Sequence, residues 1–235
     1  MARKWVLDAG CGAGRFLDVV AGTDAEVVGL DISGAIDVAR DNLRGHPRVH
    51  FVQGSIHALP FRDDMFDGVY CIGVIQHTSD PLAAVRALPR VLRPGGLIAY
   101  TIYERRSYTR WHSKYLVRPL TRRLPPGFLL STIRAAMPIL FPISEVAFRA
   151  PLVKRLLRAA IPIANYVDER ALTVRQRYSW AIMDTFDMLA PRYDQPQTEG
   201  AVTGALKDVG VAEIGRRPAA GLSVVGRRIT PSGAR

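Results

Sequence analysis

Cysteine is scarce in this sequence, since only Cys11 and Cys71 occur among its 235 residues. Both lie in short apolar stretches. Two such thiols make neither a disulfide framework nor a metal-binding set, so we expect no metal site and a chain that resides in the reducing cytoplasm. A secretory leader is not expected either, because Met1 runs almost directly into an apolar strand.

Long uncharged apolar runs are also missing, and no run reaches the ~18 residues that a membrane-spanning helix needs. Hydrophobic residues make up 48% of the chain and charged residues 23%, which is ordinary for a folded soluble protein. The charge balance is not ordinary, because 32 basic residues stand against 21 acidic ones, a net charge of +11. Such a surface can meet nucleic acid, an anionic membrane or an acidic substrate.

The most informative stretch runs from Val6 to Phe16 and reads VLDAGCGAGRF. An apolar run ends in Asp8, then Gly10, Gly12 and Gly14 occupy every second position before a helix-like pattern begins. Strand, glycine turn and helix open a βαβ unit, and the turn lets a ligand approach bare backbone beside the helix N-terminus. The stretch does not match the GxGxxG dinucleotide fingerprint, and it lacks the GK[ST] of a P-loop.

A second apolar strand, Val27 to Leu30, ends in Asp31. This acid follows the glycine turn by ~20 residues, the distance at which a βαβ unit places its ribose-binding carboxylate. The alternative is an ordinary N-cap acid ahead of the next helix.

The pattern Asp-x-Gly-x-Gly-x-Gly resembles the nucleotide-binding loop of the class I S-adenosyl-L-methionine (SAM)-dependent methyltransferases, in particular the type 11 group. A tight glycine turn in another α/β protein is the alternative. The later run of strand 66–72, GVIQH, Asp80-Pro81, helix, LRPGG and strand 97–103 resembles the same family. The resemblance covers residues 4–103 and, more weakly, 199–229, and it implies SAM as the cofactor. The residues it implies for cofactor binding are Asp8, Gly10, Cys11, Gly12, Gly14, Asp31, Ile32, Ser55, Ile56 and Cys71.

Two features depart from the family pattern. Ser55 stands where the family commonly has an acid that accepts a hydrogen bond from the adenine amino group. Only four residues precede the first strand, whereas family members usually carry helices there. Either the true start lies upstream of Met1, or the cofactor site is more open than in relatives.

Five strands that alternate with helices predict a parallel, doubly wound sheet, with the ligand at the carboxyl ends of its strands. Residues 211–215 and 222–228 are expected to close it as an antiparallel pair. We therefore predict an α/β fold, a mostly parallel Rossmann-like seven-stranded sheet with a helical insertion after strand five. The predicted division is a SAM-binding core at 1–103, a helical lid at 104–197 and the closing part of the core at 198–235, which ends in a disordered tail.

The predicted insertion holds most of the excess positive charge. Residues 128–141 are nearly apolar and are expected to be broken by Pro138, whereas 153–163 reads as a basic amphipathic helix interrupted by Pro162. In the resembling family, insertions at this point often form a lid over the acceptor. An apolar inner face suits a hydrophobic or amphiphilic acceptor, and a basic outer face can rest on anionic lipid. The alternative is a helical subdomain that merely packs on the sheet.

Acceptor contacts are expected from Gln76 and His77 after the fourth strand, from Tyr103 at the entrance to the insertion, and from Trp180 within the insertion. His77 is the best candidate for a general base, although a histidine that shapes the loop through local hydrogen bonds is the other interpretation. His112, Tyr103 and Glu104 are second choices. Trp180 shares helical spacing with two acids, Asp184 and Asp187, and packing or capping explains that pattern equally well.

The sequence thus predicts a SAM-dependent methyltransferase that acts on a small hydrophobic or amphiphilic acceptor such as a lipid or quinone. A non-catalytic SAM-binding or nucleotide-binding protein and a nucleic-acid methyltransferase are the alternatives. Against the latter, no [ND]PP[YF] tetrapeptide follows the fourth strand, and the aromatic residues form no stacking platform. We expect a cytoplasmic protein with peripheral contact to the inner membrane face and no obligate protein partner.

Overall fold

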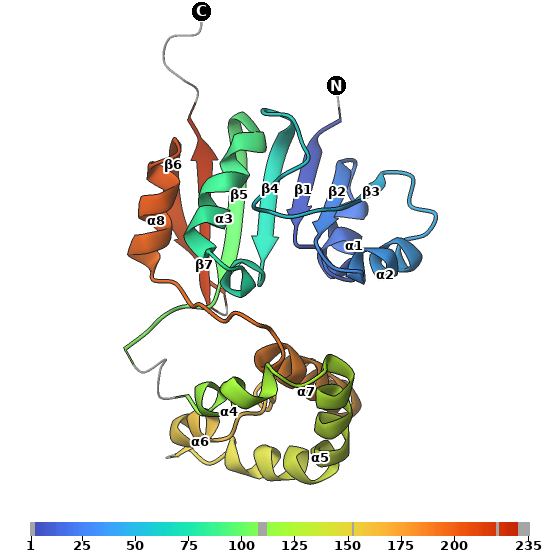
Figure 1. Ribbon diagram of the computed structural model, residues 1–235, viewed down its shortest axis with the longest axis vertical. Helices are drawn as coiled ribbons and strands as arrows, with labels where there is room; N and C mark the ends of the chain where they lie inside the picture. The colour runs from blue at the N-terminus through green and yellow to red at the C-terminus, as the bar shows by residue number, and fades with distance from the viewer. Residues whose placement is uncertain (1–2, 108–111, 152, 220, 230–235) are drawn as a thin grey trace, which may run out of the picture. The chain divides into compact units, whose positions relative to one another are not determined.

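The computed structural model describes residues 3–107, 112–151, 153–219 and 221–229 (Figure 1). The chain divides into two compact units, which are residues 1–105 with 193–235 and residues 106–192. We call the first the sheet unit and the second the helical unit, and each is described by itself. The predicted tail at 231–235 lies outside the described residues.

The sheet unit contains one seven-stranded sheet with the order β3-β2-β1-β4-β5-β7-β6 (Figure 1). Its strands are β1 (Trp5–Ala9), β2 (Glu26–Asp31), β3 (Val49–Gln53), β4 (Phe66–Ile72), β5 (Leu92–Ile102), β6 (Val211–Arg217) and β7 (Leu222–Arg228). The first five strands are parallel to their neighbours, whereas β7 is antiparallel to β5 and β6 is antiparallel to β7. The predicted Rossmann-like sheet with a closing antiparallel pair is confirmed.

Helices pack on both faces of this sheet, because successive strand residues point to opposite sides. Val27 belongs to an apolar cluster with α1 (Arg15–Ala21) and α2 (Ala35–Asn42). Its neighbour Val28 belongs to the larger cluster with α3 (Pro81–Ala87) and α8 (Glu199–Lys207). Both faces of the central strands are therefore buried, as in doubly wound folds.

The connection between β4 and β5 follows the sequence signals closely. The Asp80 side chain accepts a hydrogen bond from the Ala83 N–H at 2.9 Å and caps α3. α3 gives way to a 3₁₀ helix, η2 (Leu88–Val91), where Pro89 interrupts the α-helical pattern. β5 begins at Leu92, earlier than the expected 97, because the Arg93-Pro94-Gly95-Gly96 stretch is included in the strand.

The helical unit contains α4 (Lys114–Thr121), α5 (Pro126–Ala147), α6 (Lys154–Ala160) and α7 (Val174–Leu189) (Figure 1). Its own core is formed mainly by α5 and α7, through Leu129, Ile133, Met137, Phe141, Ala181 and Leu189, together with Ile163. The expected break at Pro138 is wrong, because α5 continues through Pro138 and Pro142. Packing of the flanking Met137 and Phe141 into this core holds the helix together where the two prolines each remove a backbone hydrogen bond. α6 ends before Pro162, as expected.

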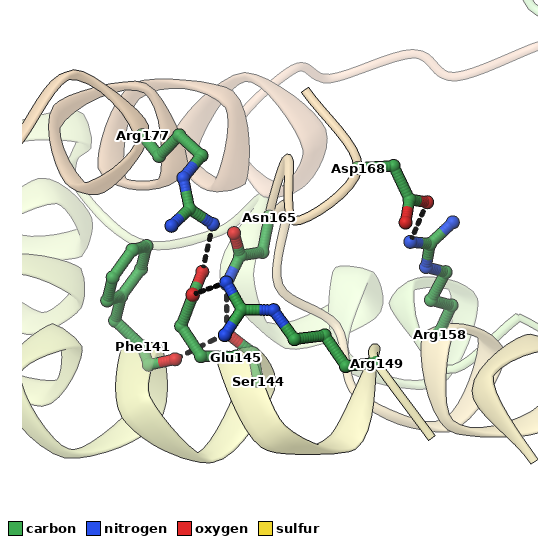
Figure 2. Close-up of polar contacts among 8 residues, drawn as sticks. All are labelled: Phe141, Ser144, Glu145, Arg149, Arg158, Asn165, Asp168 and Arg177. Atoms are coloured by element: carbon green, nitrogen blue, oxygen red, sulfur yellow. Dashed lines mark hydrogen bonds and ion pairs between the residues drawn. The ribbon is translucent and has the colours of Figure 1, made fainter. Parts of the chain in front are cut away.

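A network of ion pairs and hydrogen bonds joins the elements of the helical unit (Figure 2). Glu145 of α5 accepts from Arg177 of α7 and from Arg149, the latter at 2.7 Å. Asn165 donates to the Ser144 hydroxyl at 2.7 Å, and that hydroxyl donates to the Phe141 carbonyl at 2.8 Å. The Glu145–Arg177 pair joins α5 to α7, and the Asn165–Ser144 bond joins the segment before α7 to α5, beyond what apolar packing alone specifies.

Among the described residues, α5 is the one helix long and apolar enough, by length and composition, to cross a bilayer. The core helix of a soluble protein passes the same test. The sequence shows no uncharged run of that length, because Arg134 and Glu145 interrupt it.

Candidate cofactor and acceptor site

The glycine loop after β1 adopts a backbone that L-residues rarely take. Gly10, Gly12 and Gly14 have φ angles of +89°, +52° and +92°. A Cβ on Gly10 would lie 2.5 Å from the Val74 side chain, so this glycine also permits close packing under the loop that follows β4. A Cβ on Gly12 would meet no atom within 4 Å. The Gly12 backbone therefore borders open space, which is what a ligand lying against bare main chain requires.

Asp31, at the end of β2, is bonded to the glycine loop. One carboxylate oxygen accepts from the Gly12 N–H at 2.9 Å, and the other accepts from the Ser33 N–H at 2.8 Å and its hydroxyl at 2.7 Å. Asp31 is not the cap of α2, whose N-cap residue is Gly34. Each carboxylate oxygen has about two acceptor positions, so the oxygen bonded to Gly12 can still accept from one hydroxyl of a ribose.

Asp8 lies at the end of β1 and is only 1% exposed. Burial raises the pKa of its carboxyl to about 7, with the Asp31 carboxylate adding to the shift and the Tyr70 hydroxyl opposing it. Burial also raises the pKa of the Cys11 thiol to about 12. Cys71 is fully buried in the apolar core.

The residues expected around an adenine lie at the ends of β2 and β3. Ile32 is 71% exposed directly after β2, whereas Ile56 is buried. The Ser55 hydroxyl accepts from the His57 N–H at 3.2 Å, which leaves its own proton available for donation. An exposed large apolar side chain beside a polar loop is a surface on which a planar ring can pack.

The expected acceptor residues Gln76, His77 and Tyr103 come together in the sheet unit. The two rings of His77 and Tyr103 meet edge to face, with centroids 5.5 Å apart. The His77 Nδ1 atom lies 3.0 Å from the carbonyl oxygen of Tyr193. Because a carbonyl only accepts, Nδ1 carries the proton of the neutral ring and Nε2 is its basic nitrogen.

Gln76 is fully buried in η1 (Ile75–His77), and within the described part of the chain its side-chain amide makes no hydrogen bond. Its backbone carbonyl accepts from the Gln195 N–H at 2.8 Å. The Gln195 side chain in turn donates to the carbonyls of Thr78 and Ser79, both at 3.0 Å. A buried amide without partners is costly, and a bound polar ligand or water would satisfy it.

The segment 193–197 is therefore a part of this site that sequence reasoning missed, because it was assigned to the insertion. Tyr193 and Gln195 follow a Pro-Arg pair and show no helix-like or strand-like periodicity that would predict a place in the site. Only their place at the return of the chain into the sheet could have indicated it.

The remaining expected residues lie elsewhere. Trp180 belongs to the helical unit, where its ring packs edge to face on Tyr166 with centroids 5.6 Å apart. The Tyr166 hydroxyl bonds the Asp184 carboxylate, so this aromatic and acidic group has local partners. Glu104 accepts from Arg216 at 2.9 Å, and that ion pair makes it a poor base. His112 Nδ1 accepts from the Lys114 N–H.

The described residues contain no group of three or more His, Cys, Asp or Glu side chains placed to hold a metal ion.

Comparison with known proteins identifies the class. A family model described as a methyltransferase domain matches residues 7–100. The ubiquinone biosynthesis O-methyltransferase of Paraburkholderia phytofirmans is 30% identical over 181 residues, which are 71% of this chain and 78% of that protein. The demethylmenaquinone methyltransferase of Clavibacter sepedonicus is 37% identical over 99 residues, 42% of this chain and 40% of that protein. The match spans about half or less of most of the other curated relatives, for example 51% of the ubiquinone biosynthesis O-methyltransferase of Alkalilimnicola ehrlichii, which is 33% identical and matches 52% of this chain.

Solved structures share the fold at low identity. A SAM-dependent methyltransferase from Methanosarcina mazei is 15% identical with a TM-score of 0.54, over 97% of this chain and 94% of that one. A SAM-dependent methyltransferase from Aquifex aeolicus is 16% identical with a TM-score of 0.51, over 95% of this chain and 80% of that one.

The sheet is doubly wound and is closed by an antiparallel pair, with a glycine loop after its first strand and an acid at the end of its second. These features define a nucleotide-binding α/β protein of the methyltransferase fold. The chain belongs to the class I SAM-dependent methyltransferases, and SAM is the cofactor of that class.

Proposed function

We propose that the protein transfers the methyl group of SAM to a small hydrophobic or amphiphilic acceptor, such as a quinone or a lipid precursor. The observation that carries the proposal is the arrangement at the carboxyl edge of the sheet. There the glycine loop bonded to Asp31 and the His77–Tyr103 pair both stand at ends of neighbouring parallel strands. The names of the three curated relatives given above, each of which mentions a quinone, support the acceptor class.

The residues present fit SAM. Open space beside the Gly12 backbone admits the amino acid part of the cofactor. Asp31 is bonded to the glycine loop and follows it by the ~20 residues at which a βαβ unit places its ribose-binding carboxylate. Ile32 offers an exposed apolar face for the adenine ring, with the Ser55 hydroxyl and the Ile56 backbone for its edge. The sulfonium of SAM supplies a methyl group that is already activated, so the chain's own contribution is chiefly positioning.

A base is needed when the methylated atom is a poorly acidic oxygen or carbon. His77 suits that task, because the Tyr193 carbonyl binds Nδ1–H and thereby orients Nε2 as the nitrogen that takes the proton. Tyr103 packs against the ring and holds its plane. The buried amide of Gln76 is the neighbouring group that a polar part of the acceptor would satisfy. We propose that the helical unit, with Trp180, covers the acceptor.

The test is a transfer assay with isotopically labelled methyl groups. Purified full-length chain is incubated with labelled SAM and separate sets of quinols, simple phenols, lipids and short RNA. Label that appears in a quinol, a phenol or a lipid supports the proposal. SAM binding by calorimetry without transfer to any set would indicate a non-catalytic SAM-binding protein, and label in RNA alone would indicate a nucleic-acid methyltransferase.

A further inference from the structure

α5 is apolar on two opposite sides, which is unusual for a helix at the surface of a folded unit. One side is the buried stripe that packs against α7. The other side is exposed, and at helical spacing it presents Phe128, Ala135, Ile139, Pro142, Ile143 and Val146. Single exposed apolar residues need no explanation, but six on one side of a 22-residue helix, interrupted by Thr132, indicate a partner.

The exposure of this stripe is high. Phe128 is 61% exposed, Ile139 69%, Ile143 51% and Val146 77%. Only 28% of the most apolar part of α5 is buried. α4 has the same character, because Leu116 and Leu120 lie one turn apart and are 80% and 67% exposed.

The charge of the helical unit indicates the chemical class of this partner. Residues 106–192 contain 15 Arg and Lys against five Asp and Glu, so this unit carries a net charge of +10 out of +11 for the whole chain. Of its five acids, Glu145 is neutralised by two arginines and Asp168 is paired with Arg158 (Figure 2). Arg122, Arg123 and Arg134 are exposed, and no described carboxylate pairs with them.

Two of the conceivable partners are disfavoured by these facts. A second copy of the helical unit would bring +10 against +10, and such repulsion opposes self-association. A nucleic acid would match the charge but would leave the apolar stripe in water. A surface that is apolar and flanked by cations is complementary to the interface of an anionic bilayer, where acyl chains meet phosphate groups.

We infer that the exposed stripe of α5, in a unit that also exposes Arg122, Arg123 and Arg134, docks on a bilayer that contains anionic phospholipid. The helix lies in the interfacial layer and does not span the bilayer, because its other side packs against α7 through Met137 and Phe141. The inference places a cytoplasmic protein on the inner membrane face. It is independent of the proposed methyl transfer, which can hold for a protein that never touches lipid.

The test is flotation of the full-length chain with vesicles of neutral phosphatidylcholine, with or without about one third phosphatidylglycerol. The wild type is expected to float with the anionic vesicles, to bind the neutral ones far more weakly, and to lose affinity as salt rises. The double variant Ile139→Ser/Ile143→Ser is expected to lower vesicle affinity about tenfold or more.

The sheet unit provides a matched control. Val19 and Val38 are 70% and 50% exposed, nearly the values of the two isoleucines, and Val19→Ser/Val38→Ser is expected to float like the wild type. For the charge, Arg122→Gln/Arg123→Gln is expected to weaken binding about tenfold. Arg62→Gln/Arg217→Gln, the same change in net charge on exposed sheet-unit residues, is expected to change it little.

Several results would overturn the inference. One is an absence of preference for anionic vesicles, and another is an equal loss in the matched control variants. A wild-type dimer in light scattering that Ile139→Ser/Ile143→Ser dissociates would assign the stripe to a second copy. Weaker SAM binding by that variant, with unchanged melting, would assign it to the sheet unit of the same chain. SAM calorimetry on each variant keeps these results separate from any failure of the proposed function.

Discussion

Asp31 both shapes the glycine loop and is expected to bind the cofactor. Its carboxylate accepts from the Gly12 N–H and the Ser33 N–H, so these bonds within the chain hold the glycine loop in shape. The sequence placed this acid correctly at the end of a strand, but the bonds to Gly12 and Ser33 could not be foreseen, because they depend on how two loops meet in space.

Asp31→Ala is therefore expected to lower SAM affinity by two orders of magnitude or more, because it removes the ribose acceptor and releases the loop. Ser33→Ala is the matched control, since it deletes one of the two Ser33 bonds to the carboxylate and no ribose contact. Isothermal calorimetry measures both. Unchanged affinity in Asp31→Ala would remove the ribose assignment.

Asp8 makes the stability of the fold depend on pH. Its pKa is raised from 3.8 to about 7, so the folded chain holds this proton more tightly than the unfolded chain does. Stability then falls as pH rises between these two values and stays level above about 7. From about pH 5 to pH 8 the expected loss from this group is roughly 2–3 kcal/mol.

Asp8→Asn should abolish that part of the pH dependence, and urea unfolding at both pH values measures it. The variant is expected to be relatively more stable at the higher pH. A wild type whose stability does not fall over this range would contradict the assignment.

The sequence identified His77 as a candidate residue but could not predict which atoms its ring bonds. The bond to the Tyr193 carbonyl joins residues 116 positions apart, a relation that no local pattern encodes. His77→Asn is expected to lower the rate of methyl transfer about 10²- to 10⁴-fold while SAM affinity changes little. Tyr103→Phe, which keeps the ring that packs on His77, is the control. A kcat that survives in His77→Asn would leave His77 with a role in shaping the loop.

At the scale of elements, the strands and capping signals of the sheet unit were predictable because local pattern and tertiary packing agree there. α5 shows the opposite case. Local propensity predicts a break at Pro138, yet the buried stripe from Leu129 to Phe141 outweighs it. Packing partners far along the chain, in α7, decide the outcome, and the sequence of α5 does not contain them.

That conflict between propensity and packing should be measurable. Pro138→Ala is expected to stabilise the chain by about 1–3 kcal/mol, because it restores an N–H donor inside α5 and removes the ring's clash with the preceding turn. Pro126→Ala, at the first turn of the same helix, is the control and should not stabilise, since no backbone partner exists for its N–H. Thermal unfolding compares the two, and equal effects would show that Pro138 causes no strain.

At the scale of the whole molecule, the chain leaves and re-enters the sheet unit at neighbouring points. The Arg105 N–H donates to the Gln197 carbonyl at 2.8 Å, and the Gln197 N–H donates to the Tyr103 carbonyl at 2.9 Å. The helical unit has its own apolar core, and both clusters of the sheet unit are complete without it.

Replacing residues 106–192 with a short Gly-Ser linker should therefore leave SAM affinity within a few-fold of the wild type while methyl transfer is lost. Calorimetry and the labelled-methyl assay measure the two quantities on the same preparation. Transfer that persists at the wild-type rate would show that the helical unit does not hold the acceptor.

The paired backbone at Tyr103, Arg105 and Gln197 also has a consequence for how such proteins diversify. These backbone hydrogen bonds hold the two ends of the inserted segment side by side, so they fix where any such segment must start and finish. A segment of another length or sequence can therefore occupy this position without altering the strands that carry the glycine loop. For protein engineering, the paired backbone at Arg105 and Gln197 marks the two positions between which a foreign recognition domain can be inserted.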